Sequence, residues 1–147
     1  VSTAKGLCFS LDKPLISIST LTSLANIISV ENNAIIIPLL DARRMEVYSA
    51  VYDNHHNQIR EIKAEIIDEN SFTEYLGKGN VYFLGDGAEK CKTVIKNENA
   101  VFLDGHFPSA KQMVKLSYEK YKTSDTEDVA YFEPFYLKDF MITAPKK

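Results

Sequence analysis

Asp41 is the first residue whose type and position could do chemistry. It closes a nearly continuous aliphatic run, residues 34–40, and is followed at once by Ala42-Arg-Arg-Met45. A carboxylate at the end of a strand could face a phosphate, but phosphate-binding loops use glycine so that backbone N–H groups can approach the ligand closely. The run after Asp41 holds no glycine. We therefore interpret Asp41 as a structural corner that accepts turn amides or pairs with Arg43 or Arg44, with nucleotide binding as the alternative.

A second candidate is the turn Gly85-Asp86-Gly87, which follows a short apolar run and precedes a helical pattern. The N-terminus of a helix can hold an anion, because its first N–H groups have no partner within the helix. Two glycines around an acid are also common turn chemistry, and Asp86 with Glu89 could cap the helix. We favour the ordinary turn and keep Gly85, Asp86 and Gly87 as alternative cofactor-binding residues.

The histidines and cysteines form no recognisable site. His55 and His56 lie in a predicted hairpin turn, whereas His106 lies in a distant loop. A zinc peptidase needs ligands that converge, such as two histidines and a glutamate on one helix face. A nucleophilic cysteine is usually activated by a neighbouring histidine. Neither Cys8 nor Cys91 has a histidine close to it in the sequence. We predict no metal, no cofactor and no catalytic residue in this chain.

The composition excludes several classes of protein. A chain of 147 residues with 45% hydrophobic and 25% charged residues is typical of a globular domain. The net charge of -3 argues against direct nucleic-acid binding, which normally requires a basic surface. No apolar run is long enough to span a membrane, and no signal peptide opens the chain. Two isolated cysteines are typical of a reducing compartment, so we predict a cytoplasmic protein.

The first thirty residues predict a helix, a strand and a second helix. Residues 1–11 read as a helix that Pro14 ends, because proline cannot continue it. Residues 15–19 predict a short strand, and a helix with one apolar face begins at Thr20. Neither a convincing cap nor an initiator methionine precedes the first helix. We therefore expect the natural protein to begin upstream of Val1 and this chain to be a C-terminal piece.

The rest of the chain predicts an α/β domain. Three strands with short links, residues 34–40, 46–53 and 58–67, should pair in antiparallel fashion. Ser71 and Ser109 are predicted to cap helices, with strands at residues 81–84 and 100–103 and a helix between these strands. This order predicts a mixed five-stranded sheet in the order 3-2-1-4-5 flanked by helices, the ribonuclease-H-like arrangement. Three details complete the prediction: a β-bulge at Pro38 in the central strand, a helix that buries Ala88, Cys91 and Ile95, and a last helix that buries Ala110, Met113, Val114, Ser117 and Tyr121.

Four stretches, taken in order, resemble the TsaB family, also called YeaZ. The stretches Ser2 to Leu11 and Pro14 to Leu21 are similar to the segment that follows the family's glycine-rich motif. Leu40-Asp-Ala-Arg-Arg-Met-Glu-Val-Tyr48 resembles the Asp-Ala-Arg-x-Gly-Glu-Val-Tyr signature, with Met45 in place of its glycine. Val81-Tyr-Phe-Leu-Gly-Asp-Gly87 and Glu133-Pro-Phe-Tyr-Leu-Lys138 resemble two later stretches. The residues that carry this structural signature are Asp41, Arg43, Glu46, Tyr48, Glu133, Pro134 and Tyr136.

The resemblance implies a two-lobed fold of the actin-like ATPase and sugar-kinase superfamily, each lobe being ribonuclease-H-like. In that superfamily an acid at the position of Asp41 faces phosphate, and the turn at residues 85–87 would be a remnant of the adenosine-binding turn. The implied function is that of a non-catalytic subunit. It would bind the related catalytic subunit TsaD during threonylcarbamoyl transfer to adenosine 37 of tRNA, with an ATPase subunit of the same complex as a further partner. The alternatives are a nucleotide-binding phosphotransferase and a metal-dependent glycoprotease.

The resemblance also divides the chain into three parts. Residues 1–30 would end the N-terminal lobe, residues 31–126 would form the C-terminal lobe, and residues 127–147 would be a tail that packs back on the lobes. Subunit pairing in the family runs through helices of the N-terminal lobe. The implied partner interface, which would also make a homodimer of the protein alone, consists of Ser2, Ala4, Lys5 and Cys8. The aromatic tail residues Tyr131, Phe132, Phe135, Tyr136 and Phe140 either seal the gap between the lobes or dock a partner.

Overall fold

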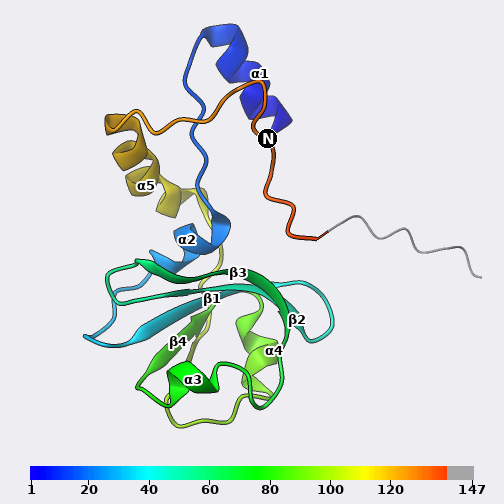
Figure 1. Cartoon of the computed structure of the whole chain (residues 1–147), viewed down its shortest axis with the longest axis vertical. Helices are drawn as coiled ribbons and strands as arrows, with labels where there is room; N and C mark the ends of the chain where they lie inside the picture. Colours follow the sequence, from blue (N-terminus) through cyan, green and yellow to red (C-terminus); the bar gives the residue numbers. More distant parts are fainter. Residues whose placement is uncertain (139–147) are drawn as a thin grey trace, which may run out of the picture.

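The structure is a computed structural model that describes residues 1–138. It has five helices and five strands within this range (Figure 1). The predicted tail residue Phe140 lies outside the described residues. The elements in chain order are α1 (Ser2–Leu11), α2 (Thr20–Ala25), β1 (Ile35–Asp41), β2 (Glu46–Tyr52), β3 (Gln58–Ile66), α3 (Thr73–Leu76), β4 (Val81–Leu84), α4 (Ala88–Lys92), β5 (Ala100–Leu103) and α5 (Ala110–Lys122).

The five strands form one mixed sheet in the order β3-β2-β1-β4-β5, as the sequence predicts. β1 pairs with β2 and β2 with β3 in antiparallel fashion, because the links between them are too short for a crossover. β4 lies parallel to β1 on one side and to β5 on the other, and a helix precedes or follows it at each crossover. The predicted ribonuclease-H-like arrangement is therefore confirmed.

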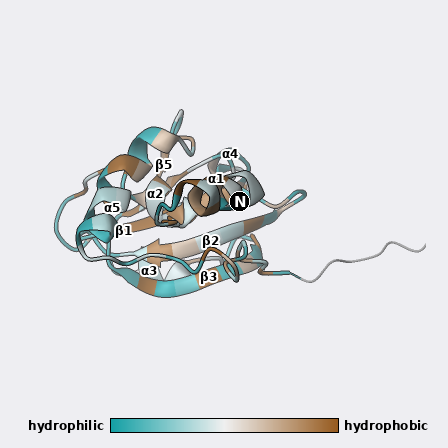
Figure 2. Ribbon diagram, turned by 90° about the horizontal axis from the view of Figure 1, so that it is seen from above, coloured by the Kyte–Doolittle hydropathy of each residue, from teal (hydrophilic) through white to brown (hydrophobic). Residues whose placement is uncertain are grey.

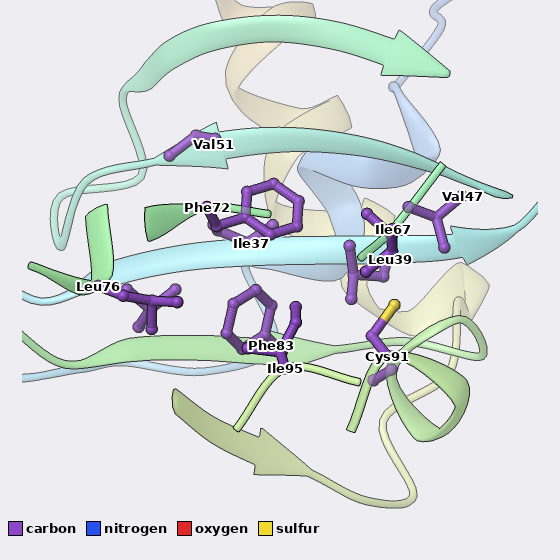
Figure 3. Packing of buried hydrophobic residues seen from close by; sticks show 12 residues of the cluster. Ile37, Leu39, Val47, Val51, Ile67, Phe72, Leu76, Phe83, Cys91 and Ile95 are labelled. Atoms are coloured by element: carbon purple, nitrogen blue, oxygen red, sulfur yellow. The ribbon is translucent and has the colours of Figure 1, made fainter. Parts of the chain in front are cut away.

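Helices cover both faces of the sheet, and this explains the aliphatic run in β1. On one face, α3 and α4 enclose a cluster that includes Ile37, Leu39, Phe83 and Cys91 (Figure 3). On the other face, α2 packs its apolar side against the sheet, with Leu24 fully buried. A strand that is covered on both faces needs apolar side chains in both directions. The residues predicted to face inward on this helix, Ala88, Cys91 and Ile95, are all buried, although α4 ends at Lys92 and Ile95 lies in the segment that follows.

The predicted β-bulge at Pro38 is wrong. β1 and β2 keep the same register on both sides of Pro38, with Ile36 opposite Tyr52 and Leu39 opposite Ser49, so no residue is inserted there. Its pairing with Leu84 of β4 is also regular. Proline lacks an N–H group, and a missing donor removes one ladder bond without moving the strands. The register shifts of this sheet lie in the β2–β3 pair instead, between Ser49 and Tyr52.

Two predicted local features also differ from the structure. Residues 15–19 form no strand, and their only β-bridge among the described residues joins Leu15 to Glu127. Ser71 does not cap α3. Its hydroxyl contacts Asp68, and Phe72 stands at the N-cap in the left-handed conformation, φ 62°. In both cases the local sequence fitted a regular element. The polar groups of Leu15 and Ser71 instead bond to Glu127 and Asp68, outside that element.

The predicted cap of α5 is correct, but its predicted buried face is wrong. The Ser109 hydroxyl accepts a hydrogen bond from the Lys111 N–H at 3.2 Å. No residue of α5 is buried, and Val114 and Tyr121 are 66% and 60% exposed. The residues of α5 with reduced exposure are Gln112, Leu116, Ser117 and Lys120. The helix is therefore rotated so that the more polar of its two possible faces turns toward the rest of the molecule.

Helix α1 stands away from the sheet, on the far side of α2 (Figure 1). None of its residues is buried, and the chain after α5 runs past it before returning toward the sheet (Figure 1). The view from above shows apolar residues within α1 (Figure 2), and Leu7, Phe9 and Leu11 of this helix are exposed. Within residues 1–138, no helix combines the length and the hydropathy that a membrane span requires.

Candidate functional site

The carboxylate of Asp41 is engaged by groups of the chain itself. Lys90 of α4 forms an ion pair with it, and the Arg43 N–H donates to it at 2.8 Å. The Lys90 ammonium also donates to the Glu46 carbonyl at 2.6 Å, and the Asp41 N–H donates to the carboxylate of Asp86 at 3.0 Å. The sequence-based interpretation of a corner that accepts turn amides agrees with this geometry. The expected partner among the arginine side chains is replaced by Lys90.

These contacts favour the ionised form of Asp41. The hydrogen bond from Lys90, followed by the one from the Arg43 N–H, holds the pKa of Asp41 below its usual range, against a smaller opposing effect of burial. Its side chain is 47% exposed, so solvent screens the ion pair, whereas Lys90 is only 20% exposed. An acid that already binds a lysine and a backbone amide has less capacity for a phosphate-bound cation.

The turn after Asp41 is built without glycine at some backbone cost. Arg43 and Arg44 both have positive φ, 70° and 50°. Non-glycine residues in this left-handed region cost about 1–2 kcal/mol each. Met45 is not among the residues with positive φ, and its carbonyl accepts from the Ile67 N–H at 2.8 Å. The resemblance placed a missing glycine at Met45, but the positions that would benefit from glycine are those of the two arginines.

The turn at residues 85–87 uses its glycines for packing against β1. Gly85 has φ 107°, and a Cβ atom there would lie 2.2 Å from the Leu39 carbonyl oxygen. The Gly87 N–H donates to the same oxygen at 3.1 Å, and a Cβ on Gly87 would lie 3.1 Å from Val47. These contacts account for the Gly-Asp-Gly pattern through close approach of two backbone segments.

One pocket adjoins this turn. It has a volume of about 540 Å³ and lies between α4 and the loop after β5. Gly85, Asp86, Lys92, Lys96 and Phe107 are among its lining residues, so charges of both signs meet one aromatic ring. Its size falls within the range of about 300–1,000 Å³ that is usual for ligand pockets. Two of the sequence-predicted alternative cofactor residues therefore line a pocket, whereas Asp41 and Gly87 are not among its lining residues.

The histidines and cysteines remain apart in the fold. The His56 ring contacts the Ile28 carbonyl at 2.9 Å, and the His106 ring contacts the Asp104 carbonyl at 2.9 Å. Residues 1–138 contain no group of three or more His, Cys, Asp or Glu side chains that could hold a metal ion. Cys91 is fully buried, and desolvation raises the pKa of its thiol to about 11. A thiol that stays protonated at neutral pH is a poor nucleophile.

The residues of the predicted partner interface lie on α1. Ser2 and Ala4 are exposed, whereas Lys5 and Cys8 are partly buried. The Lys5 ammonium donates to the carbonyls of Ala130 and Phe132 in the tail, at 3.1 and 2.8 Å. Of the predicted interface, Lys5 is therefore engaged by the tail, whereas the side chains of Ser2 and Ala4 make no hydrogen bond among residues 1–138.

The remaining signature residues lie at two places. Tyr48 of β2 packs at the edge of the core beneath α2. Glu133, Pro134 and Tyr136 lie in the tail and are exposed, Tyr136 by 76%. Glu46 connects the two places, because Lys138 at the end of the described tail forms an ion pair with it.

Sequence reasoning missed Lys90 and one internal polar cluster. Arg60 pairs with Glu65 on β3, and both contact the buried Ser49 hydroxyl of β2. The Arg60 guanidinium also lies 5.2 Å from the ring centre of Phe72. Ser49 within an apolar, alternating strand was the available signal, since a buried hydroxyl requires a hydrogen-bond partner. Lys90 gave no signal, because its partner Asp41 is 49 positions away.

Comparison with protein families gives a match over almost the whole chain. Residues 1–145 match the model of a family described as TsaD, tRNA N6-adenosine threonylcarbamoyltransferase. A curated relative is the tRNA threonylcarbamoyladenosine biosynthesis protein TsaB of Escherichia coli (strain K12). It is 28% identical over 149 residues, which cover 95% of this chain and 63% of the relative.

Solved structures of similar fold come from Pseudomonas aeruginosa. One is a protein with similarity to the peptidase YEAZ, with a TM-score of 0.76 over 93% of this chain and 65% of that one. Another is YeaZ, with a TM-score of 0.72 over 92% of this chain and 64% of that one. Both are 19% identical to this chain, so this likeness shows the fold. The chain spans less than two thirds of the length of these proteins.

Proposed function

The chain belongs to the family described as TsaD, tRNA N6-adenosine threonylcarbamoyltransferase, and from this membership we propose that it is a non-catalytic subunit of the TsaB type. In this role it binds a TsaD-type catalytic subunit and supports threonylcarbamoyl transfer to tRNA. The curated relative, which is named for threonylcarbamoyladenosine biosynthesis, supports this choice within the family. An ATPase subunit of the same complex and a second copy of the protein are further proposed partners, and the proposed location is the cytoplasm.

The observation that carries the non-catalytic role is the ion pair between Lys90 and Asp41. The acid at the end of β1 is the residue that a phosphotransferase of this fold would need for its cation and phosphate. Here Lys90 of the same chain forms an ion pair with that carboxylate. The adjoining turn has Arg43 and Arg44 at positions where a phosphate-binding loop has glycines. The corner is thus suited to holding β1, β2 and α4 together rather than to binding a nucleotide.

Exposed apolar side chains support the partner-binding role. On α1, Leu7, Phe9 and Leu11 are 57%, 82% and 62% exposed. Exposed apolar residues of this size are typical of surfaces that another protein, or another part of a longer chain, covers, and this chain spans less than two thirds of its relatives. Similar exposure is found on α5 and in the tail, at Val114, Tyr118, Tyr121, Tyr131, Phe135 and Tyr136.

The proposal is tested by co-expression of the full-length protein with the TsaD-type subunit of the same organism, followed by size-exclusion chromatography with light scattering. We expect a complex of both proteins. Ala4→Arg, which places a long charged side chain on an exposed position of α1, should weaken the complex at least about tenfold. This magnitude corresponds to roughly 1.4 kcal/mol and is typical of a charge introduced into an apolar contact.

Lys13→Ala is the matched control for Ala4→Arg. Lys13 is exposed, directly follows α1, and has no side-chain hydrogen bond or ion pair among the described residues. The complex of this variant should retain its affinity. Absence of any complex with the unmodified protein would overturn the partner-binding role, and an equal loss in both variants would overturn the placement of the interface on α1.

The pocket beside Gly85 and Asp86 favours one rival, a nucleotide-binding phosphotransferase. This rival predicts that calorimetry with MgATP gives a saturable binding curve, and that Asp41→Ala weakens it. Our proposal predicts no saturable binding of MgATP to either protein. A binding curve that disappears in Asp41→Ala would replace the non-catalytic proposal.

A further inference from the structure

The pairing of β3 with β2 is interrupted by shifts of register. It is regular up to Ser49, which lies opposite Lys63, but Val51 then lies opposite Arg60. Between these two pairs, β3 contains one residue more than β2, and a second shift follows beside Tyr52. An extra residue in one strand is a β-bulge, and it turns the next side chain toward the other face of the sheet.

The first bulge determines on which face of the sheet Arg60 lies. Val51 is buried on the face that α3 and α4 cover (Figure 3), and Arg60, which lies opposite to it, shares this face. Without the extra residue, Glu61 would lie opposite Val51, and Arg60 would lie opposite Tyr52. Tyr52 and Ile62 pack on the face that α2 covers. Strict alternation would therefore place Arg60 beside Ile62 on the α2 face.

On the face that it occupies, Arg60 contacts an acid, a hydroxyl and an aromatic ring. Its guanidinium donates to both carboxylate oxygens of Glu65 and to the Ser49 hydroxyl, the latter at 2.6 Å. Ser49 is fully buried, and its hydroxyl in turn donates to the Glu65 carboxylate. The ring centre of Phe72 lies 5.2 Å from the guanidinium. All these contacts lie within two neighbouring strands and the residue that precedes α3.

The ion pair and the bulge depend on each other. Glu65 lies opposite Val47, which is buried on the face that α3 and α4 cover. In regular pairing Glu65 would stay on that face, whereas Arg60 would lie on the α2 face, so the sheet would separate the two charges. The side chains of Arg60 and Glu65 are only 14% and 25% exposed. Separation of a largely buried pair is unfavourable, because each charge loses the partner that compensates its desolvation.

We propose that the polar cluster of Ser49, Arg60 and Glu65 fixes the register of β3, and that residues 58–62 slip into regular pairing with β2 when the cluster is lost. The cluster is poorly suited to adding stability alone, because the buried Nε of Arg60 makes no hydrogen bond among the described residues. Its effect is selective. It stabilises only the register in which Arg60 and Glu65 lie on the same face of the sheet.

The register of β3 also sets the position of the hairpin turn at residues 53–57. The Asp53 carboxylate closes this turn by accepting from the Asn57 N–H at 2.8 Å. The His56 ring contacts the Ile28 carbonyl at 2.9 Å, in the segment that follows α2. A slip of residues 58–62 has to be absorbed in the turn, and this displaces His56 from Ile28. The polar cluster on one face of the sheet therefore positions a contact on the other face.

NMR spectroscopy of the full-length protein tests the register directly, because nuclear Overhauser effects (NOEs) between the strands report which residues lie opposite each other. The unmodified protein should show backbone NOEs between Val51 and Arg60. In Arg60→Gln these should be replaced by NOEs between Val51 and Glu61. The amides of residues 58–62 should exchange at least about tenfold faster, as expected for the loss of a hydrogen bond to a charged group, whereas the amide of Ile36 in β1 should keep its rate.

Lys63→Gln is the matched control, since it makes the same change of charge on the same strand. Lys63 is exposed, and its side chain makes no hydrogen bond or ion pair within residues 1–138. This variant should keep the native NOEs and exchange rates. The proposal is overturned if Arg60→Gln keeps the NOEs between Val51 and residue 60, if Lys63→Gln changes in the same way, or if Ile36 accelerates as much as residues 58–62.

Glu65→Gln is a second variant, which decides the question in the same way if Arg60→Gln does not fold. It removes the charge of the acid and retains the size of the side chain. Because Arg60 and Glu65 act as one unit, the double variant should exchange residues 58–62 no faster than the faster single variant. Multiplied effects would contradict the shared role. These measurements require no partner protein, so the register of β3 and the proposed function are tested separately.

Discussion

Lys90 and Asp41 form an ion pair across 49 positions of the sequence, and this pair closes the corner where β1 ends and β2 begins. The lysine also donates to the Glu46 carbonyl, so a single side chain links α4 to both ends of the turn. The negative charge of Asp41 is therefore paired by a lysine of the same chain.

Replacement of Lys90 by methionine tests the importance of this corner for stability. We expect Lys90→Met to lower the free energy of unfolding by about 1 kcal/mol, because a partly exposed charge-assisted contact is lost while the apolar stem of the side chain is retained. Urea unfolding followed by circular dichroism measures the change. Lys92→Met is the control, since Lys92 is 56% exposed and lies 4.0 Å from its acidic partner. Equal losses in both variants would contradict the assigned role of Lys90.

The same variant should change the acid side of the stability profile. The pKa of Asp41 is lowered in the folded state, chiefly by Lys90, so its stabilising effect is present above the unfolded pKa near 3.8 and is lost as the pH falls through the lower folded value. In Lys90→Met the pKa of Asp41 should rise toward its usual range. Carboxyl carbon chemical shifts followed by NMR during a pH titration report this change directly. An unshifted Asp41 would show that the ion pair does not form in solution.

The strained turn predicts a stabilising substitution at Arg44. With φ at 50° and an exposed side chain, Arg44 occupies a conformation that glycine adopts freely. Arg44→Gly should raise the free energy of unfolding by roughly 0.5–1 kcal/mol, after the greater entropy of the unfolded chain is subtracted. Arg44→Ala keeps the strain and removes the same side chain, so it should give no gain. A gain in both variants would assign the effect to the arginine side chain.

The fold was predictable because strands and loops leave local patterns. The short links between residues 41 and 46 and between residues 52 and 58 dictated antiparallel pairing, and the longer connections dictated crossovers. The spacing of Ala88 and Cys91 predicted the buried face of α4, because apolar residues three or four positions apart share one face of a helix. Ile95, predicted on the same face, is buried in the segment after the helix. The strand order followed from these elements and the handedness of crossovers.

Features that depend on distant partners were not predictable. The apolar residues of α5 suggested a buried face at Val114 and Tyr121, but the helix turns Gln112 and Leu116 inward. The orientation of a helix with two possible faces is decided by what it packs against, and the pattern alone does not specify this. Lys5 contacts backbone carbonyls of the tail, and any residue type could provide these acceptors. The sequence drew attention to Asp41, but it did not predict that Lys90 would be its partner.

The two cysteines should differ sharply in reactivity. Cys8 is partly exposed, whereas Cys91 is fully buried and its thiol pKa is raised to about 11. At pH 8 a thiol-specific chromogenic reagent should label one cysteine of the native protein quickly and Cys91 only after unfolding. Native Cys8→Ser protein should show no fast-reacting thiol. Labelling of Cys91 at the rate measured in urea would contradict the burial.

Burial of Cys91 also predicts a loss of stability in alkali. Its folded pKa is higher than its unfolded value near 9, so the stabilising effect is complete below pH 9 and is lost as the pH rises toward 11. Cys91→Ala removes this titration and leaves a small cavity. The variant should be less stable at pH 7, but its stability should fall less steeply between pH 9 and 11. Parallel stability profiles for the two proteins would exclude Cys91 as a source of the alkaline loss.

Alanine substitutions at two glycines with positive φ, Gly85 and Gly105, distinguish the cost of close packing from the cost of backbone strain. At Gly85, φ 107°, an added Cβ would lie 2.2 Å from the Leu39 carbonyl oxygen and 2.7 Å from the Leu24 side chain, so β4 and β1 would have to move apart. At Gly105, φ 75°, no atom lies within 4 Å of the added Cβ. Gly105→Ala should therefore cost about 1 kcal/mol from strain alone, and Gly85→Ala should cost at least about 3 kcal/mol, or prevent folding, because overpacking of the core is added. Urea unfolding midpoints measure both losses. Equal losses would mean that the backbone at residue 85 can move away from β1, and the turn would then be free to serve a ligand rather than the core.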